Sequence, residues 1–99
     1  MIIRIVRMHF TETGTAEFLE IFARHKMAIR NFHGCLHLEL LKDNEDPTSF
    51  TTLSHWDNIA SLNAYRNSPL FDEVWGRTKS LFAKRPQAFS LVKYLEVKL

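Results

Sequence analysis

Cysteine is nearly absent from this sequence of 99 residues, with Cys35 as its one representative. A single cysteine cannot form an internal disulfide, which excludes the disulfide-stapled secreted domains. The apolar N-terminal stretch is interrupted by Arg4 and Arg7, and no small-residue cleavage site follows it, so it does not have the pattern of a signal peptide. Both features favour a cytoplasmic location. We expect Cys35 to be an inert small hydrophobe, because no activating base is evident beside it.

Glycine is also scarce, with three residues in the chain. Phosphate-cradling loops and dinucleotide-binding turns depend on closely spaced glycines, and neither pattern is present. No nucleophile elbow occurs either. The common signatures of nucleotide-binding proteins and serine hydrolases are therefore excluded.

Long runs of one charge or of apolar residues are missing as well. The net charge is +2, and the basic residues are interspersed with acidic ones, so no basic stripe indicates a nucleic-acid partner. No apolar run approaches the length that spans a bilayer, and we expect no membrane partner. What remains is an ordinary globular composition, with 45% hydrophobic residues. The length fits a single domain, residues 1–99.

Hydrophobic periodicity predicts the order of the elements. Alternation and β-branched residues predict four strands, over residues 2–10, 35–42, 48–56 and 88–97. Helical spacing predicts a first helix that follows TETGT (residues 11–15) and ends near Arg30, with Gly34 as a left-handed stop. A second helical segment begins at Asp57 as N-cap and restarts at Ser68-Pro69. Lys84, Arg85 and Pro86 are expected to end it.

This β-α-β-β-α-β order is that of the ferredoxin-like α+β fold, with helices on one face of a four-stranded antiparallel sheet. The other face must be polar or covered. In the favoured register the hairpin places one set of residues on one face: Leu36, Leu38, Leu40, Phe50, Thr52, Ser54 and Trp56. The opposite face carries Cys35, His37, Glu39, Leu41, Thr51, Leu53 and His55. That second set is half polar and half apolar, which suggests a homodimer that joins sheet to sheet.

Three stretches carry a more specific pattern, namely FHGCLHLELLKD (residues 32–43), FTTLSHW (residues 50–56) and LNAYRNSPLFDEVW (residues 62–75). They place a glycine before the second strand, a tryptophan at the end of the third, and Ser-Pro-x-Phe at the start of the last helix. In these features nearly the whole chain resembles the antibiotic biosynthesis monooxygenase (ABM) domain family of the dimeric α+β barrel superfamily. The resemblance implies two protomers joined through their sheets, and a pocket between the helices and the sheet of each protomer.

The family includes cofactor-free quinol or polyketide oxygenases, haem-degrading oxygenases and an isomerase, so the resemblance leaves the reaction open. Its haem-degrading branch uses an asparagine on the first strand, a tryptophan on the short helix and an axial histidine on the last helix. The corresponding positions here hold Arg7, Tyr65 and Trp75. A tryptophan cannot ligate haem iron, so we expect no haem degradation.

Aromatic side chains are the first candidates for a site. Trp56, Tyr65 and Trp75 are spaced through the segment that bears the family pattern. They either wall an apolar substrate pocket or simply fill the core, because large aromatics dominate core burial in any fold.

Histidines and one arginine are the second group. His37 and His9 are candidate proton acceptors, because histidine titrates near neutral pH. Arg7 shares a strand face with His9 and would orient a substrate anion if that face met the helices, or form ordinary ion pairs if it faced outward. His37, Glu39 and His55 could converge across the hairpin as a proton relay or as a polar network in a dimer interface. We expect no metal there, because one hairpin rarely gives the geometry of a metal site.

The leading hypothesis is a small monooxygenase that acts without a bound cofactor on an aromatic or quinol-like compound. A pocket that stabilises a substrate anion and admits O₂ suffices for this chemistry and leaves almost no motif. The alternatives are a non-catalytic dimer that binds a small molecule, and a non-oxidative enzyme such as an isomerase.

Overall fold

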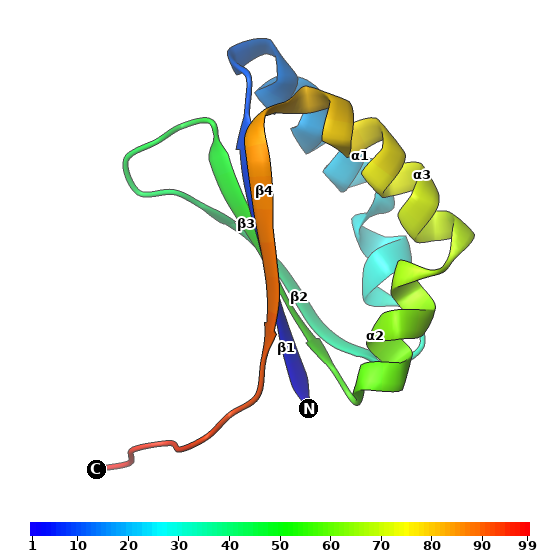
Figure 1. Ribbon diagram of the computed structural model, residues 1–99, viewed down its shortest axis with the longest axis vertical. Coiled ribbons are helices and arrows are strands. Elements are labelled where there is room, and N and C mark those ends of the chain that lie inside the picture. Colours follow the sequence, from blue (N-terminus) through cyan, green and yellow to red (C-terminus); the bar gives the residue numbers. More distant parts are fainter.

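The computed structural model describes residues 1–99 as a four-stranded antiparallel sheet with all its helices on one face (Figure 1). The strands are β1 (Ile2–Phe10), β2 (Cys35–Lys42), β3 (Ser49–Trp56) and β4 (Phe82–Leu91), in the sheet order β2-β3-β1-β4. The helices are α1 (Glu12–Arg30), α2 (Ile59–Arg66) and α3 (Pro69–Thr78), followed by a 3₁₀ turn, η1 (Lys79–Leu81). The predicted ferredoxin-like fold, with its second helical segment in two pieces, is confirmed.

The start of α2 differs from the prediction in its capping residue. Asn58, not Asp57, is the N-cap, and its Oδ1 accepts a hydrogen bond from the N–H of Ser61 at 2.9 Å. The N–H of Asp57 instead donates to the carbonyl of Gly34 at 2.9 Å. This bond holds Asp57 beside the turn that precedes β2, and the following residue, Asn58, caps the helix. The predicted N-cap of α3 is correct, because Ser68 Oγ accepts a hydrogen bond from the N–H of Phe71, the third residue of the helix.

Strand β4 was predicted six residues too late in the chain. It begins at Phe82, so residues 84–86 lie in the strand and do not end a helix. The reason is tertiary: β4 is an edge strand that pairs only with β1, and the pairing register shifts between Arg7 and His9, opposite Pro86. An edge strand with a bulge tolerates a residue that has no N–H. Residues 92–99 have no regular secondary structure, although the strand was predicted to continue to residue 97.

Pairing across the sheet separates its two faces. The inner face, toward the helices, carries aligned rows that include Leu40–Thr52–Val6–Ala88 and Leu38–Ser54–Arg4–Ser90. The outer face carries His37–His55–Ile3–Leu91, Glu39–Leu53–Ile5–Phe89 and Leu41–Thr51–Arg7–Gln87. The predicted hairpin faces are therefore correct except at the start of β2. A register shift after Cys35 places that residue opposite Trp56, so it is buried on the inner side and Leu36 is exposed.

The core between the sheet and the helices consists of two separate clusters. One gathers around Phe10, whose ring stacks on Phe18 with centroids 4.2 Å apart. The other contains Cys35, Trp56 and Leu62. The two clusters lie toward opposite ends of β1 and β3, which leaves room between them. None of the helices combines the length and the hydropathy that a membrane-spanning helix requires.

Candidate small-molecule pocket

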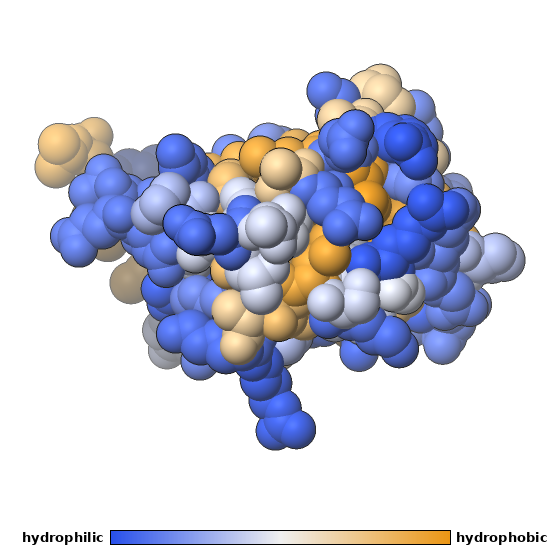
Figure 2. Space-filling model, turned by 90° about the horizontal axis from the view of Figure 1, so that it is seen from above, coloured by the Kyte–Doolittle hydropathy of each residue, from blue (hydrophilic) through white to orange (hydrophobic).

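A cavity of about 290 Å³ lies between the helices and the inner face of the sheet, in the space between the two core clusters. Met8 and Phe18 of the first cluster and Trp56 and Leu62 of the second border it. Thirteen of its eighteen lining residues are hydrophobic, as is usual for a small-molecule site. Seen from the end of the molecule, apolar atoms form a strip between polar surroundings (Figure 2).

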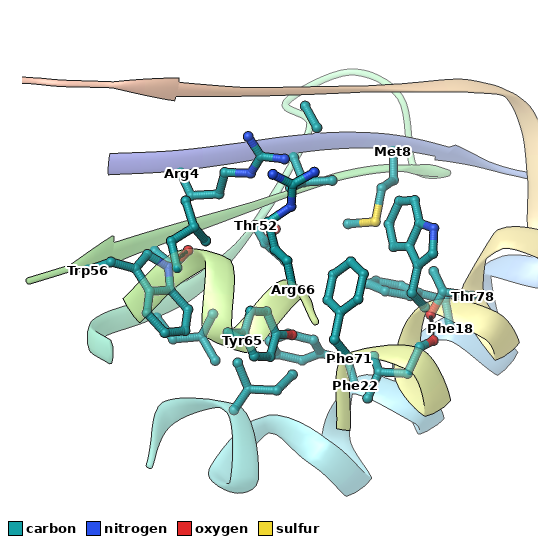
Figure 3. Close-up of a pocket in the computed structure, with 18 residues that line it drawn as sticks. Arg4, Met8, Phe18, Phe22, Thr52, Trp56, Tyr65, Arg66, Phe71 and Thr78 are labelled. Atoms are coloured by element: carbon teal, nitrogen blue, oxygen red, sulfur yellow. Dashed lines mark hydrogen bonds between the residues drawn. The ribbon is translucent and has the colours of Figure 1, made fainter. Parts of the chain in front are cut away.

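One side of the cavity is a continuous series of aromatic rings (Figure 3). Trp56 stacks on Tyr65 with centroids 5.1 Å apart, and Tyr65 meets Phe71 edge to face at 5.3 Å. Phe71 in turn stacks on Trp75 at 5.9 Å. All of these rings line the cavity, and α2 and α3 supply three of them. The three aromatics singled out in the sequence therefore come together at one cavity, and Trp56, 1% exposed, is a core residue as well.

The polar atoms of these rings differ in how they are satisfied. Trp56 Nε1 donates to Ser54 Oγ at 3.0 Å, which fixes the indole plane at the end of β3. The hydroxyl of Tyr65 makes no hydrogen bond within the chain, and burial raises the pKa of Tyr65 to about 12. At neutral pH the phenol therefore keeps its proton, and it is free to donate a hydrogen bond to a bound molecule.

Two arginines, which the sequence analysis did not select, also line the cavity. Arg4 comes from the inner face of β1, and Arg66 comes from the last turn of α2 (Figure 3). Arg4 donates to Ser90 Oγ at 3.1 Å. The one sequence signal for Arg4 was its place on the face that also carries Val6 and Met8, a single cation on an otherwise apolar strand face.

No histidine, aspartate or glutamate lines this cavity. Its polar side chains include the guanidinium groups of Arg4 and Arg66 and the phenol of Tyr65, none of which is a proton acceptor of the carboxylate or imidazole kind. The cavity can accordingly enclose a flat apolar molecule and stabilise negative charge on it, but its own side chains supply no general base.

The other predicted site residues lie on the opposite face of the sheet. Arg7 pairs with Asp43, with the closest nitrogen and oxygen atoms 3.7 Å apart, and does not border the cavity, so its assignment to the pocket is wrong. Successive side chains along a strand point to opposite faces of the sheet. Arg7 is three residues from Arg4, so the two arginines lie on opposite faces. His9 and His37 share the outer face with Arg7. Their role as proton acceptors stays a prediction, and it would have to operate outside this cavity.

A polar group does form across the hairpin on the outer face. His37 Nε2 lies 3.2 Å from Glu39 Oε1, and the rings of His37 and His55 are 4.9 Å apart. No group of three or more His, Cys, Asp or Glu side chains is placed so that it could hold a metal ion. The predicted convergence of these three residues is present in the structure, as a surface polar network.

Comparison with known proteins gives one family and many similar structures. The sequence pattern of the family described as "Antibiotic biosynthesis monooxygenase" matches residues 1–75. A Deinococcus radiodurans protein provisionally assigned to that family has 18% identity and a TM-score of 0.88, over 100% of this chain and 98% of that one. A similarly assigned Bordetella bronchiseptica protein has 23% identity and a TM-score of 0.82, over 95% and 97%. No curated protein matches significantly. At these identities the structural likeness shows a shared fold.

Proposed function

Because the chain belongs to the antibiotic biosynthesis monooxygenase family, whose pattern it matches over residues 1–75, we propose that it is a monooxygenase that acts, without a bound metal or flavin, on an aromatic or quinol-like small molecule. Membership supports a monooxygenase-like or small-molecule-binding function. The proposal of a particular reaction and substrate class is argued from the cavity.

The observation that carries the proposal is the aromatic wall of the cavity. Stacked rings favour flat, electron-rich molecules, because offset stacking adds to the gain from apolar burial. Trp56, Tyr65, Phe71 and Trp75 present such a wall. A volume of about 290 Å³ lies at the lower end of the range for ligand pockets and suits a compact ring system.

The proposed reaction begins with ionisation of a substrate hydroxyl. No acidic or histidine side chain lines the cavity to accept the proton, so it leaves to solvent, and the cavity favours the substrate anion electrostatically. The electron-rich anion then reacts with O₂. Hydroxylation of one ring carbon of a quinol, together with oxidation of the quinol to the quinone, supplies all four electrons that O₂ needs. One oxygen atom enters the product as the new hydroxyl and the other leaves as water, so the substrate itself is the reductant.

Oxygen uptake with a panel of quinols and polyphenols tests this proposal, with ¹⁸O₂ and mass spectrometry of the product. We expect one labelled oxygen per product molecule, at a rate well above uncatalysed autoxidation. Trp75→Ala removes part of the wall and should lower kcat/KM roughly tenfold. Leu19→Ala, a matched control at an exposed apolar residue on α1, should leave the rate unchanged. Oxygen uptake no faster than autoxidation across the panel would contradict the proposal.

The absence of a general base from the cavity favours a second candidate, a protein that binds its ligand without changing it. Tight binding of a panel compound, with no oxygen uptake and no altered product, is the result that distinguishes it. A product formed without oxygen uptake would instead indicate a non-oxidative enzyme such as an isomerase.

We further propose that the outer face of the sheet pairs with the same face of a second copy, as the family resemblance implies. Phe89 and Leu91 on β4 are 46% and 48% exposed there, beside Ile5 and Ile3. Nδ1 of His9, on the same face, is buried without a hydrogen-bond partner. An exposed apolar patch of this kind, with polar side chains around it, commonly marks an interface between proteins.

A further inference from the structure

We propose that the ligand of the cavity is an aromatic anion, whose carboxylate or phenolate oxygen is held between the guanidinium groups of Arg4 and Arg66. This inference rests on the proposed function only in taking the cavity as a small-molecule site. It adds the charge of the ligand and the two residues that recognise it.

The first observation is that two like charges converge on one apolar cavity. Arg4 reaches it from β1 and Arg66 from α2, and their guanidinium groups point into the same region in Figure 3. Burial, together with the positive charge of Arg66, lowers the pKa of Arg4 below its ordinary value. The two cations are therefore close enough to repel each other, which is unfavourable in a partly desolvated site.

The second observation is that neither arginine has an acidic partner. Arg7 pairs with Asp43, and Arg77 pairs with Glu73. In contrast, Arg4 donates only to the neutral hydroxyl of Ser90, and Arg66 forms no ion pair or side-chain hydrogen bond. Most of their guanidinium donors therefore remain available to a bound molecule.

The third observation is the surroundings of Arg4. Its row across the inner face holds Leu38, Ser54 and Ser90, all uncharged, and the neighbouring row holds no charge. The half-buried guanidinium of Arg4 therefore has no compensating anion on its own face of the sheet, and a bound anion would supply one. A neutral aromatic ligand would contact the ring wall but would leave the repulsion between the arginines in place. An anion placed between them removes it and accepts charge-assisted hydrogen bonds from both.

Isothermal titration calorimetry with 2-naphthoate and 2-naphthamide tests the inference, because the two probes share a ring system and differ in charge. We expect the purified protein to bind naphthoate at least about tenfold more tightly than naphthamide. Arg4→Gln and Arg66→Gln should each remove most of this preference and leave the affinity for naphthamide unchanged. Arg24→Gln, at an exposed arginine on α1 that does not line the cavity, should keep the full preference.

Each other outcome is informative. Equal binding of the two probes, or a preference that survives both cavity variants, would overturn the anion site and leave the cavity as a small-molecule site. Binding of neither probe would remove the basis of both proposals. A naphthoate preference that depends on the two arginines supports the anion site even where no oxygen uptake is found, in which case the monooxygenase proposal alone fails. Unchanged naphthamide binding also shows that each variant is folded.

Discussion

Gly34 is the residue at which the backbone leaves least room for substitution. Its φ of +88° lies in the left-handed region, and a Cβ there would overlap the side chain of Ser61 and lie 2.7 Å from Asp57 Oδ1. Because Ser61 belongs to α2, the close approach at Gly34 sets how near that helix sits to the start of β2. The position of α2 determines in turn where Tyr65 and Arg66 enter the cavity.

Gly34→Ala is therefore expected to lower the free energy of unfolding by about 2 kcal/mol or more, from backbone strain and steric overlap. Gly76→Ala is the matched control. A Cβ there meets nothing within 4 Å, and alanine favours a helix interior over glycine by about 1 kcal/mol, so the protein should become more stable. Urea unfolding measures both. Equal losses in the two variants would show that the contact with α2 is not what restricts Gly34.

Ionisation of Tyr65 should make the free energy of unfolding depend on pH at high pH. Burial raises its pKa to about 12 in the folded protein, against about 10 in an unfolded chain. A raised pKa means that the protonated phenol favours the folded state. This contribution is complete below pH 10 and is lost as the pH rises from 10 to 12, by about 2–3 kcal/mol for two pKa units.

The difference in unfolding free energy between the wild-type protein and Tyr65→Phe should therefore change by that amount between pH 9 and pH 12, since phenylalanine does not ionise. Tyr94→Phe, at a side chain 99% exposed, should show no such change. Denaturant unfolding at several pH values measures it. A pH-independent difference for Tyr65→Phe would mean that the phenol ionises freely in the folded protein.

At the scale of elements, the start of α2 depends on one side chain. Asn58 Oδ1 accepts from the N–H of Ser61, whereas Asp57 contributes its backbone N–H to Gly34. Asn58→Ala should destabilise the protein by about 1 kcal/mol, the usual cost of a lost N-cap. Asp57→Ala should cost less, because it removes a favourable charge near the helix start but no cap. Thermal unfolding of both variants measures which substitution costs more stability. A larger loss for Asp57→Ala would indicate that Asp57 is the N-cap.

At the scale of the whole molecule, the proposed dimer makes a prediction about mass. The double variant Phe89→Glu, Leu91→Glu places two like charges on the outer face and should convert a dimer into a monomer in light scattering after size-exclusion chromatography. Leu19→Glu, at a residue 40% exposed on α1, should leave the mass unchanged. A wild-type protein that is monomeric at micromolar concentration would contradict the proposal.

The sequence by itself determined the elements that depend on local order. Strand alternation in β1 and most of β2, the helical spacing of α1 and the Ser68-Pro69 restart appear where their residues predict them. Gly34 has a positive φ, but α1 ends at Arg30 with Asn31 as its C-cap, so Gly34 shapes the turn into β2 and does not stop the helix as predicted. The helix also begins earlier than predicted, at Glu12, because Thr11 is its N-cap. The confirmed features depend on neighbours within a few residues of one another, so a linear pattern contains the information. The family pattern, carried by glycine and aromatic positions, could be recognised for the same reason.

Only the tertiary structure decided the position of β4, the inner location of Cys35 and the charge of the cavity. β4 is defined by its pairing with β1, more than seventy residues earlier in the chain. Without that partner, residues 84–86 have the local pattern of a helix end. Arg4 and Arg66 meet because a strand face and a helix end converge across the layer between sheet and helices. Contacts between residues so far apart in the chain leave no periodic signal, which is why Arg7 was selected from the sequence and Arg4 was found only in the fold.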